Sequence, residues 1–148
     1  MKARDIMTPN PEVVTPDEPV TRAAELMRDL NVGIIPVVDD RSSMRLTGLI
    51  TDRDIAVRHV AEGHQQACNV SDHMTSDTLN CVRPDADVDE VMSLMGRDQV
   101  RRIPVVESDN KLVGIIAQAD LAVHEGPQHP KKVEKVLEKI SEPAQPER

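Results

Sequence analysis

The sequence contains no phenylalanine, tyrosine or tryptophan among its 148 residues. Proteins that bind single-stranded nucleic acids stack the bases on aromatic rings, so that mechanism is excluded here. Positive charge is also scarce, with 18 lysines and arginines against 26 aspartates and glutamates, which gives a net charge of −8. A protein of this charge does not attract the phosphates of duplex DNA or RNA, or an anionic membrane surface. We therefore expect no nucleic-acid partner and no membrane partner.

The chain has only two cysteines, Cys68 and Cys81, so no disulfide framework is indicated. No apolar run approaches the ~18 residues of a membrane-spanning helix, and no hydrophobic signal segment follows the first residues, Met1–Asp5. Together these features predict a cytoplasmic protein. The hydrophobic content of 39% is sufficient for a folded chain.

An internal repeat dominates the sequence. Three short blocks recur in the same order, 66 to 68 residues apart: residues 5–8 (DIMT) at 72–75 (DHMT), 35–38 (IPVV) at 103–106, and 48–50 (GLI) at 114–116 (GII). The chain is thus two copies of one unit. We predict a first repeat over 1–66, a second over 67–125 and a tail over 126–148.

Each copy has the same predicted order of strand, helix, strand, strand and helix, preceded by a short helix at 3–7 or 70–74. Apolar residues spaced three and four apart predict the longer helices, from Val20 to Leu30 and from Val88 to Met95. Asp87 and Glu90 predict a capping pair at the start of the second of these helices. Because one copy buries little surface alone, we expect a mixed α/β fold in which the two copies pack sheet against sheet.

The tail has a pattern of its own, with Val133, Val136, Leu137 and Ile140 at helical spacing. We predict a short amphipathic helix over 131–140 and disorder over 144–148. The apolar face of this helix needs cover, either within the chain or across a dimer. Because closed two-fold dimers are the commonest soluble assembly, we expect a homodimer.

The doubled pattern of Asp-Ile-Met-Thr, helix, Ile-Pro-Val-Val and Gly-Leu-Ile-Thr-Asp-Arg-Asp resembles a tandem pair of CBS domains, the Bateman module, over residues 3–124. The chain is also similar to short stand-alone bacterial proteins that consist only of such a pair, including those of the hypoxic response type. The resemblance implies a disc with pseudo-two-fold symmetry and two clefts between the repeats. It also implies clefts that bind AMP, ADP, ATP or S-adenosylmethionine, and a ligand that regulates a partner protein without catalysis in the module.

Thr51 and Asp54 are the first candidate ligand residues, because they follow a predicted strand and open a helix. A carboxylate at this place accepts hydrogen bonds from ribose hydroxyls, and Thr51 donates to a ribose or phosphate oxygen. The alternative is a capping box, which has the same Thr-x-x-Asp spacing, and one pair of residues can do both. The second copy has Ala117 in place of the threonine and retains the acid as Asp120. We take this retention to favour a ligand role for the acid.

Arg101 and Arg102 precede the second Ile-Pro-Val-Val block, where the family resemblance implies basic residues that reach nucleotide phosphates. Arg97 adds positive charge nearby, whereas the first copy has Gly33–Ile34 at the matching place. The alternative is a solvated arginine pair near a helix end. We expect a weaker or adenosine-only cleft around Asp120. The complete cleft is predicted to use Thr51, Asp54, Arg101 and Arg102.

Without aromatic rings, an adenine base has to lie between aliphatic side chains, and backbone groups have to recognise its edge. The candidates from the two copies are Ile35, Pro36, Val37, Ile103, Pro104 and Val105. This arrangement predicts a preference for adenosine ligands over pyrimidine nucleotides.

The sequence offers few residues for other chemistry. His64 and Cys68 are four residues apart and would suit zinc on a helix, but Gly63 and Gln65–Gln66 favour a loop. We therefore predict no metal site and no required cofactor. No glycine-rich phosphate loop or nucleophile constellation is present, so we expect no enzymatic activity. The alternative function is a protein-interaction scaffold whose clefts are vestigial.

Overall fold

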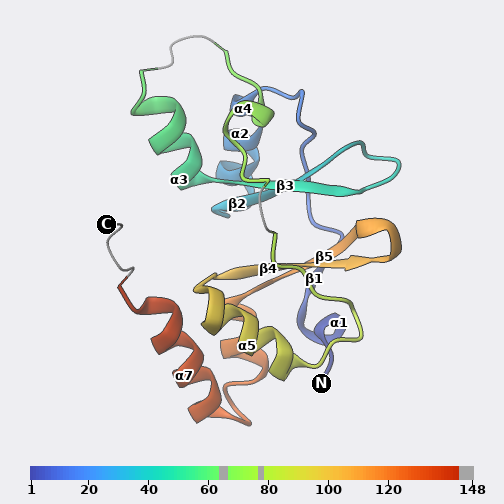
Figure 1. Ribbon diagram of the computed structural model, residues 1–148, viewed down its shortest axis with the longest axis vertical. Helices are drawn as coiled ribbons and strands as arrows, with labels where there is room; N and C mark the ends of the chain where they lie inside the picture. Colours follow the sequence, from blue (N-terminus) through green and yellow to red (C-terminus); the bar gives the residue numbers. More distant parts are fainter. Residues whose placement is uncertain (64–66, 77–78, 144–148) are drawn as a thin grey trace. The chain divides into compact units, whose positions relative to one another are not determined.

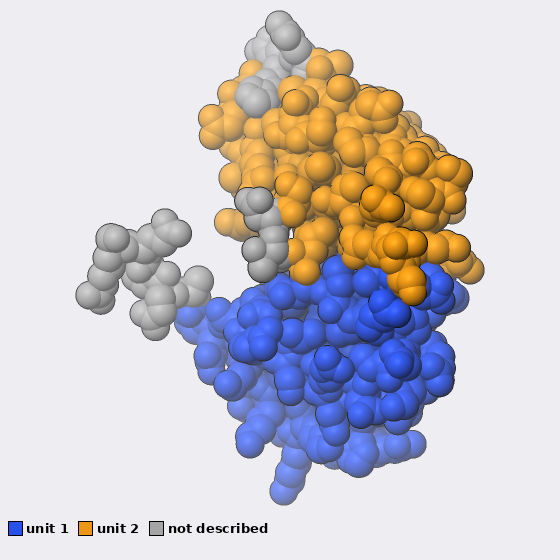
Figure 2. Space-filling view, turned by 45° about the vertical axis from the view of Figure 1, so that its right-hand side comes forward, with its two compact units in different colours: residues 1–9, 80–107, 113–148 blue, residues 10–79, 108–112 orange. Residues whose placement is uncertain are grey.

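The computed structural model describes residues 1–63, 67–76 and 79–143 (Figure 1). The chain forms two compact units, coloured separately in Figure 2. Unit 1 contains residues 1–9, 80–107 and 113–148, and unit 2 contains residues 10–79 and 108–112. The repeat limits 1–66 and 67–125 stay a prediction. The disorder predicted for 144–148 falls outside the described residues.

Unit 2 is built around the hairpin of β2 and β3, which pair antiparallel from Ile34 opposite Thr51 to Val38 opposite Leu46. Val14 adds a parallel bridge to Val37. The elements of this unit are α2 (Val20–Leu30), β2 (Ile34–Val38), β3 (Leu46–Thr51), α3 (Asp52–Asp54), the π-helix η1 (Ile55–Val60), α4 (Val70–His73) and the 3₁₀ turn η2 (Ser108–Asn110).

Unit 1 has a three-stranded sheet in the order β1-β5-β4, with Thr8 opposite Ile115. Its elements are α1 (Ala3–Ile6), β1 (Thr8–Pro9), α5 (Val88–Asp98), β4 (Arg102–Glu107), β5 (Lys111–Ala117), α6 (Gln118–His124) and α7 (Pro130–Ser141). The first two residues of β5 belong to unit 2, where the Leu112 N–H donates to the carbonyl of Met44 at 2.8 Å. Val82 bridges in parallel to Val105, as Val14 does to Val37 in the other unit.

The leading segments of the two sequence copies are exchanged between the units. Met7 and Thr8 pack on Gly114 of β5, whereas Met74 and Thr75 pack on Gly48 of β3. Thr75 also exchanges two backbone hydrogen bonds with Leu49, of 2.8 and 2.9 Å. Each Asp-x-Met-Thr segment therefore completes the sheet of the other copy, which explains why the compact units do not follow the sequence repeats.

Each unit has its own buried apolar cluster. In unit 2 the cluster contains Val14, Ala23, Leu26, Met27, Ile35, Val37, Ile50 and Val70. In unit 1 it includes Ala3, Ile6, Val91, Met95, Ile103, Val105, Ile116 and Leu121. Helix α5 buries its predicted apolar face, from Val88 to Met95. Helix α2 buries Val20, Ala23 and Met27 of its predicted face, whereas Leu30 at its end is exposed. The mixed α/β class with a C-terminal helix is confirmed.

The C-terminal helix α7 packs against α5 within the same chain (Figure 1). Val133 and Ile140 are buried in the cluster of unit 1, and Val136 and Leu137 pack partly against it. The apolar face of the tail helix is therefore covered in cis. None of the helices within the described residues is long and apolar enough to span a membrane.

The predicted capping pair at the start of α5 is wrong. Asp87 is the N-cap residue of this helix, but its side chain accepts no hydrogen bond from the helix backbone. Its carboxylate instead accepts a hydrogen bond from the Lys2 ammonium group, with Nζ and Oδ1 2.8 Å apart. The same hydrogen bond lowers the pKa of Asp87. The charge-assisted bond to Lys2 therefore replaces the cap.

Candidate functional site

Thr51 and Asp54 form a capping box at the start of α3. The Thr51 hydroxyl oxygen accepts the backbone N–H of Asp54 at 3.0 Å. In return, Asp54 Oδ2 accepts the backbone N–H of Thr51 at 3.0 Å. These bonds satisfy two N–H groups that have no partner inside the helix. The structural alternative is thus present, and any ligand function of these residues is additional to it.

The second oxygen of the Asp54 carboxylate faces Arg58, one turn further along the helix. Arg58 Nε lies 3.7 Å from Asp54 Oδ1, beyond hydrogen-bond distance. The guanidinium group also donates to the backbone carbonyl of His73 at 3.4 Å. The side chain of Asp54 is only 13% exposed. Because an ionised carboxylate accepts about four hydrogen bonds, Asp54 retains capacity for hydroxyl donors.

Asp120, in the first turn of α6, makes one of the two hydrogen bonds of a capping box. Its Oδ2 accepts the backbone N–H of Ala117 at 2.7 Å, and alanine has no side-chain acceptor to return the bond. The acid therefore caps the helix without a threonine partner, so its retention in the second copy has a structural cause. The retention therefore does not distinguish a ligand role from a cap, and the ligand role of Asp120 stays a prediction. Asp5 and Asp72 cap α1 and α4 by the same bond.

Arg101 lies beside the start of α6, because its carbonyl accepts the backbone N–H of Gln118 at 2.9 Å. In unit 2 the equivalent bond joins Asp52 to Gly33, also at 2.9 Å, so that unit has no basic side chain at this place. Arg101 is exposed and Arg102 is partly buried.

Arg97 does not contribute free positive charge to this region. Its Nη2 lies 3.0 Å from a carboxylate oxygen of Asp98. The hydrogen bond from Arg97 lowers the pKa of Asp98, so the carboxylate is ionised and balances the arginine charge. Arg101 and Arg102 therefore carry the positive charge of this segment.

The residues predicted to hold adenine are buried in the strands. Ile35 and Val37 belong to the cluster of unit 2, and Ile103 and Val105 to that of unit 1, each no more than 1% exposed. The prolines between them, Pro36 and Pro104, are buried as well. These side chains are committed to packing, so contact with a base stays a prediction. On β3, the partly exposed face carries Thr47, Leu49 and Thr51.

The predicted ligand residues are divided between the units. Thr51 and Asp54 belong to unit 2, whereas Arg101, Arg102 and Asp120 belong to unit 1. Within unit 1 the backbone of Arg101 and the cap made by Asp120 meet at the start of α6. The combination of Thr51 and Asp54 with the two arginines stays a prediction.

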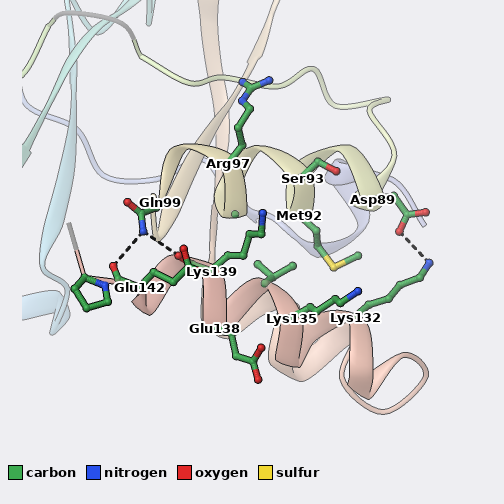
Figure 3. A pocket seen from close by; sticks show the side chains of 13 residues that line it. Asp89, Met92, Ser93, Arg97, Gln99, Lys132, Lys135, Glu138, Lys139 and Glu142 are labelled. Atoms are coloured by element: carbon green, nitrogen blue, oxygen red, sulfur yellow. Dashed lines mark hydrogen bonds and ion pairs between the residues drawn. The ribbon is translucent and has the colours of Figure 1, made fainter. Parts of the chain in front are cut away.

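A groove that the sequence did not predict runs between α5 and α7 in unit 1 (Figure 3). Its volume is about 910 Å³, and Lys132, Lys135 and Lys139 line it from α7. Gln99 closes one end by donating to the carbonyls of Lys139 and Glu142, both at 3.1 Å. The spacing of the three lysines by three and four residues was the available sequence signal.

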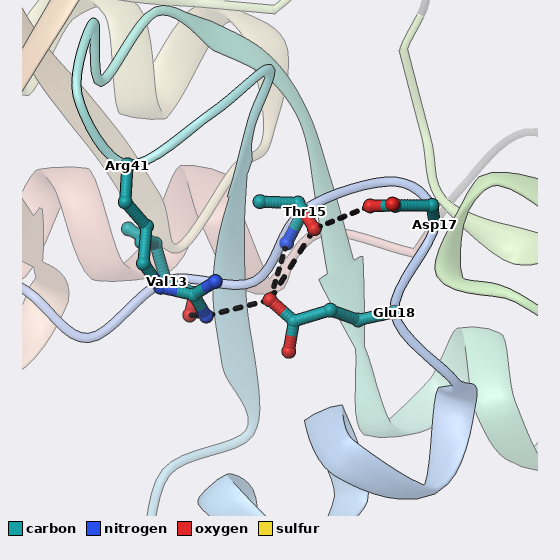
Figure 4. A network of polar contacts seen from close by, with 5 residues as sticks. All are labelled: Val13, Thr15, Asp17, Glu18 and Arg41. Carbon is teal, nitrogen blue, oxygen red and sulfur yellow. Dashed lines mark hydrogen bonds and ion pairs between the residues drawn. The ribbon is translucent and has the colours of Figure 1, made fainter.

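A polar network in unit 2 fixes the segment before α2 (Figure 4). Arg41, from the loop between β2 and β3, lies 2.6 Å from a carboxylate oxygen of Glu18 and donates to the carbonyl of Val13 at 3.0 Å. Glu18 also accepts the backbone N–H of Thr15 at 3.1 Å. The Thr15 hydroxyl donates to Asp17 and lowers the pKa of that carboxyl. The network ties the hairpin loop to the segment that enters α2.

Sequence reasoning missed one side-chain cluster. His59, Cys68 and His73 bring one ligand atom each to within 4.8 Å of one another. The available signal was the spacing His-x₈-Cys-x₄-His, which the comparison of His64 with Cys68 overlooked. His64 itself lies outside the described residues. The second cysteine, Cys81, is partly buried, and this burial raises the pKa of its thiol. Cys81 is accordingly a poor nucleophile.

The fold and the two helix starts define a protein made of two copies of one small α/β unit, each with an acid-capped helix after its hairpin. The chain belongs to the CBS domain family, whose model matches residues 3–59 and 70–124. The resemblance seen in the sequence is therefore confirmed. Hypoxic response protein 1 of Mycobacterium tuberculosis is 37% identical over 122 residues, which cover 82% of this chain and 83% of that protein.

Solved structures agree. The crystal structure of a Hypoxic Response Protein I with two coordinated zinc ions has a TM-score of 0.74 and 34% identity, covering 84% of this chain and 98% of the other. CBSX2 in complex with AMP has a TM-score of 0.71 and 30% identity, covering 88% and 98%. The CBS domain pair of MJ0100 in complex with 5'-methylthioadenosine and S-adenosyl-L-methionine has a TM-score of 0.74 and 25% identity, covering 86% and 98%.

Proposed function

We propose that this chain is a non-catalytic regulatory module that binds an adenosine-containing ligand of the AMP, ADP, ATP or S-adenosylmethionine class. Membership of the CBS domain family supports the proposal. It is also supported by similar structures in complex with AMP and with S-adenosyl-L-methionine. The ligand acts by changing how the chain associates with a second copy or with a partner protein.

The Asp54 carboxylate is the observation that carries the proposal. It is nearly buried at the start of α3, and one oxygen is held by the cap while the other is 3.7 Å from Arg58. A positioned carboxylate with spare acceptor capacity matches the vicinal hydroxyls of a ribose. Adenosine and AMP both present these hydroxyls. Thr51 supplies a hydroxyl beside the carboxylate for a further ribose or phosphate oxygen.

In unit 1 the proposed ligand residues are Asp120 for a ribose and Arg101 and Arg102 for phosphate. The bond from the Gln118 N–H to the Arg101 carbonyl supports this assignment, because it brings the basic pair to the start of the helix that Asp120 caps. Guanidinium groups bind phosphate through paired N–H donors. Unit 2 has Gly33 at the matching place and offers no such charge.

We place the adenine base against aliphatic side chains of the strands, as the lack of aromatic residues requires. Because Ile35 and Val37 are buried in the core, the partly exposed Leu49 is the better placed contact on unit 2. It lies on the same face of β3 as Thr51, two residues away. Backbone groups then recognise the edge of the base.

Self-association is part of the proposal. Leu30, at the end of α2, is 46% exposed, and Val32 follows it on the surface. The equivalent helix of unit 1, α5, is covered by the twelve-residue helix α7 in the same chain, whereas α2 contacts the four-residue helix α4. A homodimer would cover these apolar side chains. An interaction scaffold without a ligand is the second candidate, and the same exposed residues favour it.

The deciding experiment compares two aspartates that cap helices in unit 2 by the same bond. Asp54→Asn and Asp72→Asn both keep a side-chain oxygen that can accept the N-cap N–H. Thermal shift with adenosine and with AMP, followed by circular dichroism because the chain lacks aromatic residues, reports binding. Wild type and Asp72→Asn should be stabilised by about 2.7 kcal/mol when the ligand is at 100 times Kd.

In Asp54→Asn the unit 2 site should lose ~10- to 150-fold in affinity for both ligands, because a charged acceptor is removed. Equal losses in the two variants would show that a helix cap alone is being measured. If no nucleotide shifts the melting temperature of the wild type, the scaffold function replaces the sensor function.

A further inference from the structure

His59, Cys68 and His73 form a group that we call the His–Cys–His cluster, and it lies within unit 2. One ligand atom of each residue lies within 4.8 Å of the others. The closest pair is His59 Nδ1 and His73 Nε2, which are 3.2 Å apart. His73 is buried, and the other two side chains are partly buried. The cluster is separate from the predicted ligand residues, although it begins on the helical segment that follows Asp54.

Fixed backbone positions hold the three residues. His59 lies in η1, whose backbone is held by π-helical bonds such as that from the Ala61 N–H to the Ala56 carbonyl at 2.8 Å. Short π-helical segments within helices are frequent at functional sites. The carbonyl of Cys68 accepts the N–H of Val20 at 2.9 Å, which anchors the cysteine just before α4.

The helix that carries His73 is anchored as well. The N–H groups of Val70 and Ser71 donate to the carbonyls of Glu18 and Pro16, at 2.8 and 2.9 Å. The cluster therefore needs little reorganisation of the backbone to bind a common ligand. Side chains fixed in this way lose little conformational freedom when a ligand binds.

The second copy supplies an internal comparison. The residue equivalent to His73 is Ile6, at the same place in the Asp-x-Met-Thr segment, and the two are 3% and 2% exposed. The position of His59 corresponds to Glu125, and that of Cys68 to Met1. The same buried place is therefore apolar in one copy and an imidazole in the other. In unit 2 this place holds an imidazole that lies beside a second histidine, with His59 Nδ1 and His73 Nε2 3.2 Å apart, so nitrogen ligands are gathered in this copy alone.

We propose that the His–Cys–His cluster binds one divalent zinc-type ion through His59 Nδ1, His73 Nε2 and the Cys68 thiolate. Two imidazole nitrogens and one thiolate are ligands that zinc prefers. With Zn–N bonds of about 2.0–2.1 Å, the nitrogens of a tetrahedral site are about 3.3 Å apart. The observed 3.2 Å between the two histidine nitrogens fits that edge. A small side-chain rotation of Cys68 completes the set.

The competing explanation is a direct N–H···N hydrogen bond between the two rings, which also has this length. The two explanations differ in whether Cys68 takes part. They also differ in what happens when metal is added, because binding of an ion requires the Cys68 thiolate and therefore releases the thiol proton. The thiol proton goes to solvent when the Cys68 sulfur forms its bond to the ion, and no electron is transferred.

Titration of the full chain with Co²⁺ under reducing conditions tests the proposal. Cobalt replaces zinc in tetrahedral sites, and a bound thiolate gives a charge-transfer band in the near ultraviolet. The chain has no tyrosine or tryptophan absorbance to hide this band. We expect one Co²⁺ per chain, the charge-transfer band, visible ligand-field bands, and loss of both signals when Zn²⁺ is added.

The variants locate the site. Cys68→Ser should lose the charge-transfer band, and His73→Ile should weaken cobalt affinity more than about tenfold. His73→Ile introduces the residue that the first copy has at the equivalent position, Ile6, so the fold should tolerate it. His59→Ala, at a partly buried position, is the second histidine variant. Cys81→Ser, which removes the other cysteine, should retain both the band and the affinity.

The proposal is overturned if the wild type shows no charge-transfer band. It is equally overturned if the band persists in Cys68→Ser, if neither histidine variant weakens binding, or if Cys81→Ser abolishes it. All measurements are made without nucleotide. A protein that binds AMP but gives no cobalt band would therefore contradict the metal site alone.

Discussion

Thr51 and Asp54 are joined by two reciprocal hydrogen bonds, each 3.0 Å long, between the side chain of one residue and the backbone N–H of the other. The same two residues are the proposed contacts of the ribose. The helix start is thus held in place before any ligand arrives, which lowers the ordering cost of binding. Measurements on Asp54 therefore have to separate its structural contribution from its ligand contribution.

The difference between the two helix starts predicts opposite effects of exchanging their first residues. Thr51→Ala removes the hydroxyl cap and should lower the free energy of unfolding by about 1 kcal/mol. Ala117→Thr should raise it, because Asp120 already supplies the other half of the box. Urea unfolding followed by circular dichroism measures both changes. A stabilising Thr51→Ala would show that the cap has no energetic value.

The two halves of a nucleotide should be separable in unit 1. Arg102→Ala should weaken AMP binding by ~10- to 150-fold and leave adenosine binding unchanged, because only phosphate loses a charged partner. Arg97→Ala is the matched control, since the guanidinium of Arg97 is already paired with Asp98. Calorimetry with both ligands measures the effect. Equal losses for AMP and adenosine would contradict a phosphate contact.

The exchange of leading segments can be tested at Gly48. An added Cβ there would lie 2.8 Å from the carbonyl oxygen of Thr75 and 3.0 Å from Met74 Sδ. Gly48→Ala should therefore destabilise the protein by about 1–3 kcal/mol, as overpacking does. Gly96→Ala is the control, because its Cβ would meet only the Lys139 side chain at 3.5 Å.

Alanine is also the better helix former at position 96, so this control should be neutral or stabilising by about 0.5–1 kcal/mol. Urea unfolding decides between the outcomes. A neutral Gly48→Ala would mean that Met74–Thr75 does not pack on β3.

The hairpin loop of unit 2 predicts a loss of stability in acid. Hydrogen bonds from the Ser43 hydroxyl to Asp39 and from the Ser42 hydroxyl to Asp40 hold the pKa of each carboxyl below its value of 3.8 in an unfolded chain. A carboxyl of lowered pKa stabilises the fold above the unfolded value, and the contribution disappears as the pH falls through the folded pKa. The urea concentration at the midpoint of unfolding should therefore decrease as the pH is lowered below about 4.

Asp40→Asn should make that drop shallower, because the variant has no carboxylate to protonate at this position. Glu62→Gln, on the exposed surface, should leave the profile unchanged. An identical acid profile for wild type and Asp40→Asn would contradict the contribution of this loop.

Apolar periodicity was sufficient to predict most elements. The spacing from Val20 to Leu30 gave α2, and the paired β-branched runs gave both hairpins. The tail helix predicted over 131–140 is observed over Pro130–Ser141. These predictions succeed because each element buries one apolar face, and a local pattern records that face.

The exchange of segments could not be predicted in the same way. Met7 and Met74 lie in nearly identical motifs. Judged by residue type alone, either methionine could pack on the glycine of β3 or on that of β5. The choice of partner depends on chain connection and packing rather than on local sequence. The clustering of Cys68 with His59 and His73 is also non-local, because it brings together residues from η1, from the segment before α4 and from α4 itself.

The candidate site was predicted only in part. The cap of Thr51 and Asp54 follows from a four-residue spacing and was recognised as an alternative. The burial of Ile35 and Val37 in the core was visible in the apolar run itself, which reads equally as a buried strand. A sequence pattern does not distinguish a side chain that lines a site from one that fills a core.

The most direct test of the account is calorimetric titration of the wild-type chain with AMP and, under identical conditions, with CMP. The two ligands carry the same phosphate and ribose and differ only in the base. A site made of an acid at a helix start, a basic pair and aliphatic strand residues predicts saturable binding of AMP and at least tenfold weaker binding of CMP, a difference of about 1.4 kcal/mol. Equal affinity for the two nucleotides, or no heat with either, would contradict an adenosine-specific module.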